Sequence, residues 1–295
     1  MQFSLYLKKI LQEKKLTRNE LIARLNLYHD VFSNLDAITF SRWITNKTTP
    51  SPYKQALIAQ HLGNDVIEFM KYDLTIRKES KIVESIFDKL MTKLEKSYSN
   101  ISYFYDVDSF EYSVDIFDSQ RFNDNLSLFY KRFKLYGLLK DKMNNINTIC
   151  IYKTHNKLIA SHISLFKLNE NLASRLSNIF NIDLDVNRFF INISYIDNRN
   201  SYFFMISVLL YYLYNNTEMY FYCVIREDFL EYMTSISCEQ IGNAFIDNGF
   251  KIYLLKVDLI NVMVNQFVMN FFLKEMENNE MFFNDSLNKL ENMML

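Results

Sequence analysis

The clearest hydrophobic periodicity in the chain lies between residues 82 and 94. Apolar residues recur there as pairs every four positions, with Lys and Glu between them, which predicts one amphipathic helix. The default interpretation is that this helix packs within its own chain, and dimerisation is the alternative. Shorter apolar repeats before it predict helices over 3–13, from Thr17 onward, over 39–44 and from Ser51 to Gly63.

After residue 100 the pattern becomes rich in aromatic and β-branched residues, which is typical of strands. Strands are predicted over 102–105, 111–117, 189–196, 218–224 and 250–255, with a hairpin over 148–154 and 157–165. Helices are predicted over 203–214, near 236–247, over 259–276 and over 282–294. The predicted fold class is therefore α+β, with an all-α domain (1–72), a connector helix (73–100) and a mixed domain (101–295).

Local signals define the helices of the first domain. Thr17 precedes Glu20 by three positions, which predicts a capping box at a helix start. Phe40 and Trp43 can face inward together, and Asn46 suits the left-handed conformation of a helix stop. Pro50 cannot continue a helix, so the next one is predicted to begin after it.

These segments resemble the lambda-repressor-like helix-turn-helix family of the Cro/repressor, or XRE, type. The resemblance rests on four stretches in order: Leu16-Thr17-Arg18-Asn19-Glu20-Leu21-Ile22-Ala23, Phe40-Ser41-Arg42-Trp43-Ile44-Thr45-Asn46, Pro50-Ser51 and Ile58-Ala59-Gln60-His61-Leu62. Two departures stand out. The spacing from Leu21 to Trp43 is about eight residues longer than usual, through residues 26–35, so that turn could itself touch DNA or a partner. The usual Gly at the helix stop is replaced by Asn46.

The resemblance implies a recognition helix in the major groove of double-stranded DNA, with Arg42 as a bidentate guanine contact. Some of the implied contacts reach bases and others reach phosphates, which position the protein without reading sequence. The implied DNA-binding residues are Thr17, Arg18, Ala37, Ile38, Thr39, Ser41, Arg42, Asn46, Lys47 and Thr48.

The order of elements after residue 100 resembles the GNAT acetyltransferase fold, with Asn248-Gly249-Phe250 similar to the Gly-Phe entry of a late strand. That family holds the CoA pyrophosphate on a Gly-rich loop, but residues 197–202 contain no Gly here. Ile246 stands near the place of the family's usual Tyr general acid. The chain is therefore predicted not to be an enzyme, and no catalytic, cofactor-binding or metal-binding residue is assigned.

Charge and cysteine content agree with a DNA-binding head. Residues 1–70 hold nine Lys or Arg and six Asp or Glu, a net charge of +3, so the rest carries −4 of the overall −1. Three cysteines without metal-like spacing suit a reducing cytoplasm. No signal peptide is expected, and the apolar run over 203–214 is too short to span a bilayer, so no membrane association is expected.

The resulting hypothesis is a cytoplasmic transcriptional regulator that binds double-stranded DNA, forms a homodimer, and senses a small-molecule, peptide or protein effector through its C-terminal domain. Three alternatives stay open. One is a peptide-sensing regulator of the Rgg/PlcR type with an all-helical body. Another is a DNA-targeted acetyltransferase, and the third is an interaction protein whose head no longer binds DNA.

Overall fold

The computed structural model describes residues 2–76, 81–99, 110–144 and 146–294. The chain divides into two compact units. The first comprises Met1–Ser80 with Met263–Met269, and the second comprises Lys81–Val262 with Asn270–Leu295. Each is described separately below.

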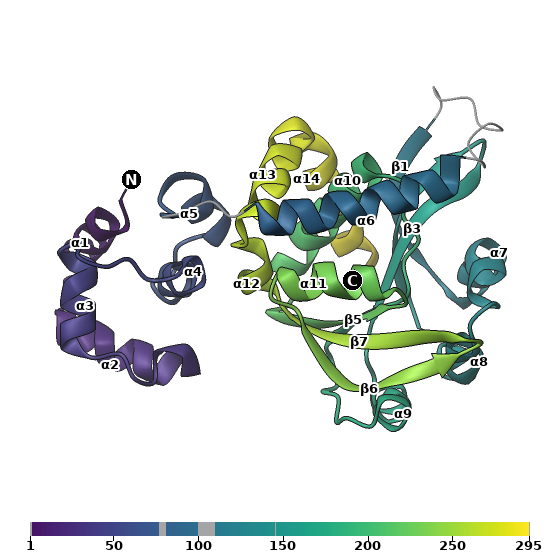
Figure 1. Cartoon of the computed structure of the whole chain (residues 1–295), viewed down its shortest axis with the longest axis horizontal. Coiled ribbons are helices and arrows are strands. Elements are labelled where there is room, and N and C mark those ends of the chain that lie inside the picture. Colours follow the sequence, from purple (N-terminus) through teal and green to yellow (C-terminus); the bar gives the residue numbers. More distant parts are fainter. Residues whose placement is uncertain (1, 77–80, 100–109, 145, 295) are drawn as a thin grey trace. The chain divides into compact units, whose positions relative to one another are not determined.

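The first unit contains five α-helices and one 3₁₀ turn among its described residues up to 76 (Figure 1). These are α1 (Phe3–Glu13), α2 (Arg18–Tyr28), η1 (Asp30–Phe32), α3 (Ala37–Ile44), α4 (Pro52–His61) and α5 (Val66–Tyr72). Side chains of the preceding residue cap four of the helices: Thr17, Asp36, Ser51 and Asp65 each accept a hydrogen bond from a first-turn amide. This pattern satisfies donors that would otherwise lack partners at a helix start.

Several local predictions for this unit are confirmed. Thr17 and Glu20 form the complete capping box, and Phe40 and Trp43 are both buried. Asn46 adopts a left-handed φ of 58° after α3. The long turn over 26–35 is built from the end of α2 and from η1, and Phe32 packs in the core below it.

The second unit is organised around a seven-stranded sheet in the order β1-β2-β3-β4-β5-β7-β6. All neighbouring strands are antiparallel except β4 and β5, which are parallel. The strands are β1 (Phe110–Phe117), β2 (Thr148–His155), β3 (Leu158–Lys167), β4 (Phe189–Ile191), β5 (Met219–Val224), β6 (Glu239–Asp247) and β7 (Phe250–Asp258). This mixed α/β arrangement is consistent with a GNAT-like fold, and it excludes the all-helical body.

Helices cover both faces of the sheet (Figure 1). Their bounds are α6 (Ile82–Ser99), α7 (Ser119–Tyr130), α8 (Lys134–Leu139), η3 (Lys140–Lys142), α9 (Glu170–Phe180), α10 (Arg199–Tyr214), α11 (Glu227–Ser235), α12 (Leu259–Met263), α13 (Gln266–Asn278) and α14 (Glu280–Met294). One face forms a core with α7, α8 and α9 through residues such as Cys150 and Phe190. Neighbouring strand positions point the other way, where Phe189 packs on Tyr212 of α10. The alternation of side chains along each strand thus supplies two apolar layers.

The helix predicted over 82–94 is α6, which lies beside α11 within the second unit (Figure 1). Phe87 is fully buried. Its ring centroid lies 4.9 Å from that of Tyr202 and 5.1 Å from that of Tyr232. The apolar stripe therefore has a partner inside its own chain.

The predicted helix near 236–247 is wrong, because residues 239–247 form strand β6. Asn248 and Gly249 have φ values of 48° and 85°, the two left-handed positions of a tight hairpin turn that joins β6 to β7. The helix predicted over 259–276 is two helices, α12 and α13. Asn265 accepts a hydrogen bond from the Phe267 amide and so starts a new helix.

Other strand predictions had mixed outcomes. The hairpin is confirmed as β2 and β3, with its turn at Asn156 and Lys157, both at positive φ. The strand predicted over 189–196 is shorter than expected, because β4 ends at Ile191. The segment after β4 pairs with β3 again at an isolated bridge between His162 and Tyr195, where the register has shifted by one residue. The strand predicted over 102–105 lies outside the described residues.

Candidate functional site

The residues implied as base contacts lie on the outer side of α3. Ala37, Ile38 and Arg42 are exposed, while Thr39 and Ser41 are half-buried. Positions 38 and 42 are one helical turn apart and therefore neighbours on the surface. Asp36 caps this helix by accepting a hydrogen bond from the Thr39 amide at 2.6 Å.

The residues implied as phosphate contacts follow α3 or begin α2. Asn46 and Lys47 are exposed and Thr48 is half-buried, in a turn closed by hydrogen bonds from the Lys47 and Thr48 amides to the Arg42 carbonyl. The Asn46 side-chain amide donates to the side-chain oxygen of Gln2 at 3.2 Å. It therefore already has one partner within the unit.

Thr17 and Arg18 are exposed at the start of α2. The Glu20 carboxylate accepts hydrogen bonds from the Thr17 amide (2.7 Å) and hydroxyl (2.8 Å). These hydrogen bonds lower the pKa of Glu20. The Thr17 hydroxyl, implied as a DNA contact, is thus already engaged within the capping box that the sequence predicted.

Among the described residues, three cations implied as DNA contacts have no carboxylate in direct contact, although the charge of Arg42 contributes to the lowered pKa of the nearby Asp36. Within the described part of the chain, no carboxylate lies within ion-pair distance of Arg18, Arg42 or Lys47, whereas nine ion pairs form elsewhere. An unpaired guanidinium beside small and apolar side chains can donate two parallel hydrogen bonds to one external acceptor group.

The long turn before α3 is held against α4. The Tyr28 hydroxyl donates to the Gln60 side chain at 2.7 Å, and the Tyr28 ring lies 4.6 Å from that of His61. His29 accepts a hydrogen bond from the Val31 amide at 3.1 Å. These contacts give the extra residues a defined place in the fold of this unit.

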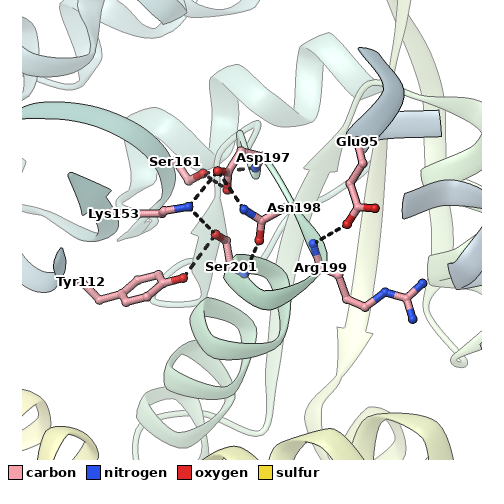
Figure 2. Close-up of polar contacts among 8 residues, drawn as sticks. All are labelled: Glu95, Tyr112, Lys153, Ser161, Asp197, Asn198, Arg199 and Ser201. Carbon is pink, nitrogen blue, oxygen red and sulfur yellow. Dashed lines mark hydrogen bonds and ion pairs between the residues drawn. The ribbon is translucent and has the colours of Figure 1, made fainter. Parts of the chain in front are cut away.

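The second unit contains a buried polar cluster that the sequence did not single out (Figure 2). Lys153 of β2, with its side chain only 5% exposed, pairs with Asp197 at 2.8 Å. Its ammonium also donates to the Ser201 hydroxyl at 3.2 Å and lies 3.9 Å from the centre of the Phe110 ring. Lys153 continues the inward face of Ile149 and Ile151, and a charged residue at such a position is the signal that could have revealed the cluster.

Two more side chains, Ser161 and Tyr112, complete this cluster. Ser161 donates to Asp197 at 2.7 Å, and the Asp197 amide donates back to the Ser161 oxygen at 3.1 Å. The hydroxyls of Tyr112 and Ser201 lie 3.2 Å apart. Burial raises the pKa of Tyr112, and the charge of Asp197 adds to that effect.

The start of α10 is occupied by acceptors from the chain itself (Figure 2). Asn198 accepts a hydrogen bond from the Ser201 amide at 2.9 Å, and Glu95 of α6 accepts one from the Arg199 amide at 3.1 Å. The Arg199 side chain pairs with Asp88 at 2.7 Å. Because exposed amides at a helix start attract anions, Glu95 takes a position that an anionic group would otherwise favour.

The described residues contain no group of three or more His, Cys, Asp or Glu side chains arranged to hold a metal ion. None of their helices combines the length and the apolar character that crossing a bilayer requires.

Comparisons with known proteins give similarity in solved structures alone, since no family model and no curated protein sequence matches the chain. An N-acetyltransferase from Staphylococcus aureus Mu50 aligns with a TM-score of 0.34 and 13% identity, covering 51% of this chain and 99% of the other. The CoA-dependent acyl-homoserine lactone synthase MesI aligns with a TM-score of 0.34 and 10% identity, covering 54% and 95%. At these identities the similarity concerns the fold, and no residue role is taken from it.

These neighbours correct one prediction. Both are enzymes by their descriptions, so the expectation from the sequence that the chain is not an enzyme is contradicted and is not retained. The weak resemblance of the body to GNAT acetyltransferases agrees with them.

Proposed function

We propose that the helical unit binds double-stranded DNA through α3 and that the protein regulates transcription. One observation carries the proposal: Arg42 is exposed, has no carboxylate partner among the described residues, and shares a helix face with Ala37, Ile38 and Ser41. Arginine is the side chain best suited to the two acceptors of guanine in the major groove.

The surrounding surface supports this assignment. Arg18 and Lys47 flank α3 in sequence and are exposed without an ion-pair partner among the described residues. Lysine and arginine in such positions neutralise phosphates and hold the reading helix in register. Asp36 precedes α3, and Glu20 lies in the first turn of α2. Because both carboxylates repel phosphates, they favour an approach in which the DNA backbone meets only the cations.

The second unit would then supply regulation. One helical reader covers few base pairs, so two copies on paired half-sites would raise both affinity and specificity. We propose a homodimer whose GNAT-like body binds an effector and changes the spacing of the two readers by population shift.

The test is selection of bound DNA from a random pool with the full chain, followed by affinity measurements on the enriched site. Arg42→Ala is expected to weaken binding roughly thirtyfold, corresponding to about 2 kcal/mol, and to remove the preference at one base position. Arg175→Ala changes an exposed arginine of α9 and serves as the matched control. The absence of any enriched sequence would refute the proposal.

A second candidate function is that of an acetyltransferase that uses acetyl-CoA and is brought to DNA by its helical unit. The observation that favours it is the parallel pairing of β4 with β5, because the chain leads from the end of β4 through residues 192–198 to the start of α10. A CoA pyrophosphate at this helix start would have to displace Glu95 from the Arg199 amide.

Calorimetry with acetyl-CoA tests this candidate. If acetyl-CoA binds at the start of α10, Glu95→Gln is expected to increase the affinity, because the substitution removes a negative charge that competes with phosphate. Glu84→Gln changes another acidic residue of α6 and is the control. If Glu95→Gln left the affinity for acetyl-CoA unchanged, the ligand would bind elsewhere. If acetyl-CoA did not bind at all, this candidate function would be refuted.

A further inference from the structure

Ile38 is an exposed apolar side chain on the outer side of α3. It is 65% exposed at the second position of α3, whereas Phe40 and Ile44 of the same helix are buried. A solvent-facing isoleucine forgoes the stabilisation that burial of its side chain would give. Its position, one turn before Arg42, places this apolar group on the same surface as the unpaired guanidinium.

The chemistry of Ile38 limits what it can recognise. Its side chain has no hydrogen-bonding atom, so it cannot read the donors and acceptors of base edges. The major groove presents one apolar group, the C5-methyl of thymine, and apolar side chains discriminate bases through this group. An isoleucine at this position therefore fits a thymine and gains nothing from cytosine, whose C5 carries hydrogen.

Helix geometry sets the distance between the side chains of Ile38 and Arg42. Four residues of an α-helix span about 6 Å along its axis. Successive bases of one strand are about 3.4 Å apart. Side chains at 38 and 42 are therefore about two base pairs apart when the helix lies along the groove.

We propose that Ile38 reads the C5-methyl group of a thymine about two base pairs from the guanine that Arg42 contacts. This inference rests on the proposed DNA-binding function and adds to it the chemical group that a second position of α3 recognises. The alternative is that the exposed Ile38 side chain contacts a second copy of the chain. The experiment below distinguishes a thymine contact from a contact between copies.

The experiment uses the full chain and the site enriched from the random pool. Each thymine of the site is replaced in turn by uracil, which lacks the methyl group, and by 5-bromouracil, whose bromine has a similar size. At one position we expect uracil to weaken binding about fourfold, the factor for losing one buried methyl-sized group, and 5-bromouracil to restore it.

The variants assign this effect to Ile38. Ile38→Ala is expected to bind the thymine and uracil sites equally, while Ile38→Val keeps most of the discrimination. Because the side chain is exposed, both variants should unfold at the wild-type temperature, and a thermal melt checks this. Leu128→Ala, at an exposed leucine of α7, is the matched control that leaves the thymine preference unchanged.

The outcomes separate the two hypotheses. Failure to enrich any DNA overturns the proposed function and the inference with it. Enrichment with no uracil-sensitive position, or with a sensitivity that Ile38→Ala keeps, overturns the inference alone. A change in sedimentation of Ile38→Ala without a change in base preference would assign the residue to contact between copies.

Discussion

At the scale of single residues, Asp197 shows how burial and pairing compete. Burial alone would raise the pKa of this carboxyl, but hydrogen bonds from Lys153, Ser161 and Ser201 and the charge of Lys153 outweigh it and lower the pKa below 3.8. The pair contributes to the stability of the second unit only while both partners are present, because each partner compensates the buried charge of the other.

Lys153→Met is therefore expected to destabilise the second unit by about 3 kcal/mol, because it leaves the Asp197 charge without compensation. Asp197→Asn should be similarly harmful, and the double substitution should recover part of the loss. Urea unfolding of the three variants measures the coupling. Additive losses would show that the two side chains act independently.

The pH dependence has a definite sign. A carboxyl whose folded pKa lies below its unfolded value stabilises the protein above that unfolded value, and this stabilisation is lost as the pH falls through the lower folded value. For Asp197 the window therefore opens near pH 3.8 and extends below it. The stability gap between wild type and Lys153→Met should narrow on acidification through this window, and a constant gap would contradict the assigned pairing.

At the scale of elements, the sequence predicted most strands and helices, and the failures have physical causes. The capping box at Thr17 and the stop at Asn46 are local interactions, so their residues could be identified without tertiary structure. Strand β6 could not, because its burial is irregular and its pairing shifts register between Ile241 and Phe245. The Asn248-Gly249 hairpin turn was the available signal for β6.

The candidate sites divide in the same way. The surface of α3 could be predicted because its residues are close in the sequence. The cluster around Lys153 joins residues from β1, β2, β3 and the start of α10. Their proximity depends on strand order and register, which one sequence does not reveal.

Gly242 provides a test of how β6 packs. It lies at the register shift with a φ of 61°, and a Cβ there would overlap the carbonyl oxygen of Phe180 in α9. Gly242→Ala is expected to cost about 3 kcal/mol from backbone strain and overlap together. Gly249→Ala is the matched control, because its φ is also positive but its Cβ would meet no atom within 4 Å, so it should cost about 1 kcal/mol.

Chemical denaturation of the two glycine variants decides the matter. Equal losses would mean that the conformation of the backbone alone is responsible. A larger loss at Gly242 would locate the close approach between α9 and the edge strand.

At the scale of the whole molecule, charge is unevenly distributed between the two parts of the chain. Residues 1–70 carry +3 and the remainder carries −4. Under the proposed function, an acidic body would disfavour contact with DNA except through the basic unit, because like charges repel over about 10 Å at moderate salt. Orientation on DNA would then follow from charge before any base is read.

Lys47 tests this electrostatic contribution separately from base recognition. The affinity for DNA falls as the salt concentration rises. If the Lys47 ammonium contacts one phosphate, Lys47→Ala should make the slope of log affinity against log salt concentration shallower by about 0.9. It should also weaken binding to the enriched and to random sequences by the same factor, because phosphates carry no sequence information. Lys131→Ala, at an exposed lysine after α7, controls for the loss of one positive charge elsewhere and should leave the slope unchanged.

Arg42→Ala should instead weaken binding mainly to the enriched sequence. If both Lys47→Ala and Arg42→Ala reduced binding uniformly, α3 would hold DNA without reading it, and the proposed specificity would be wrong.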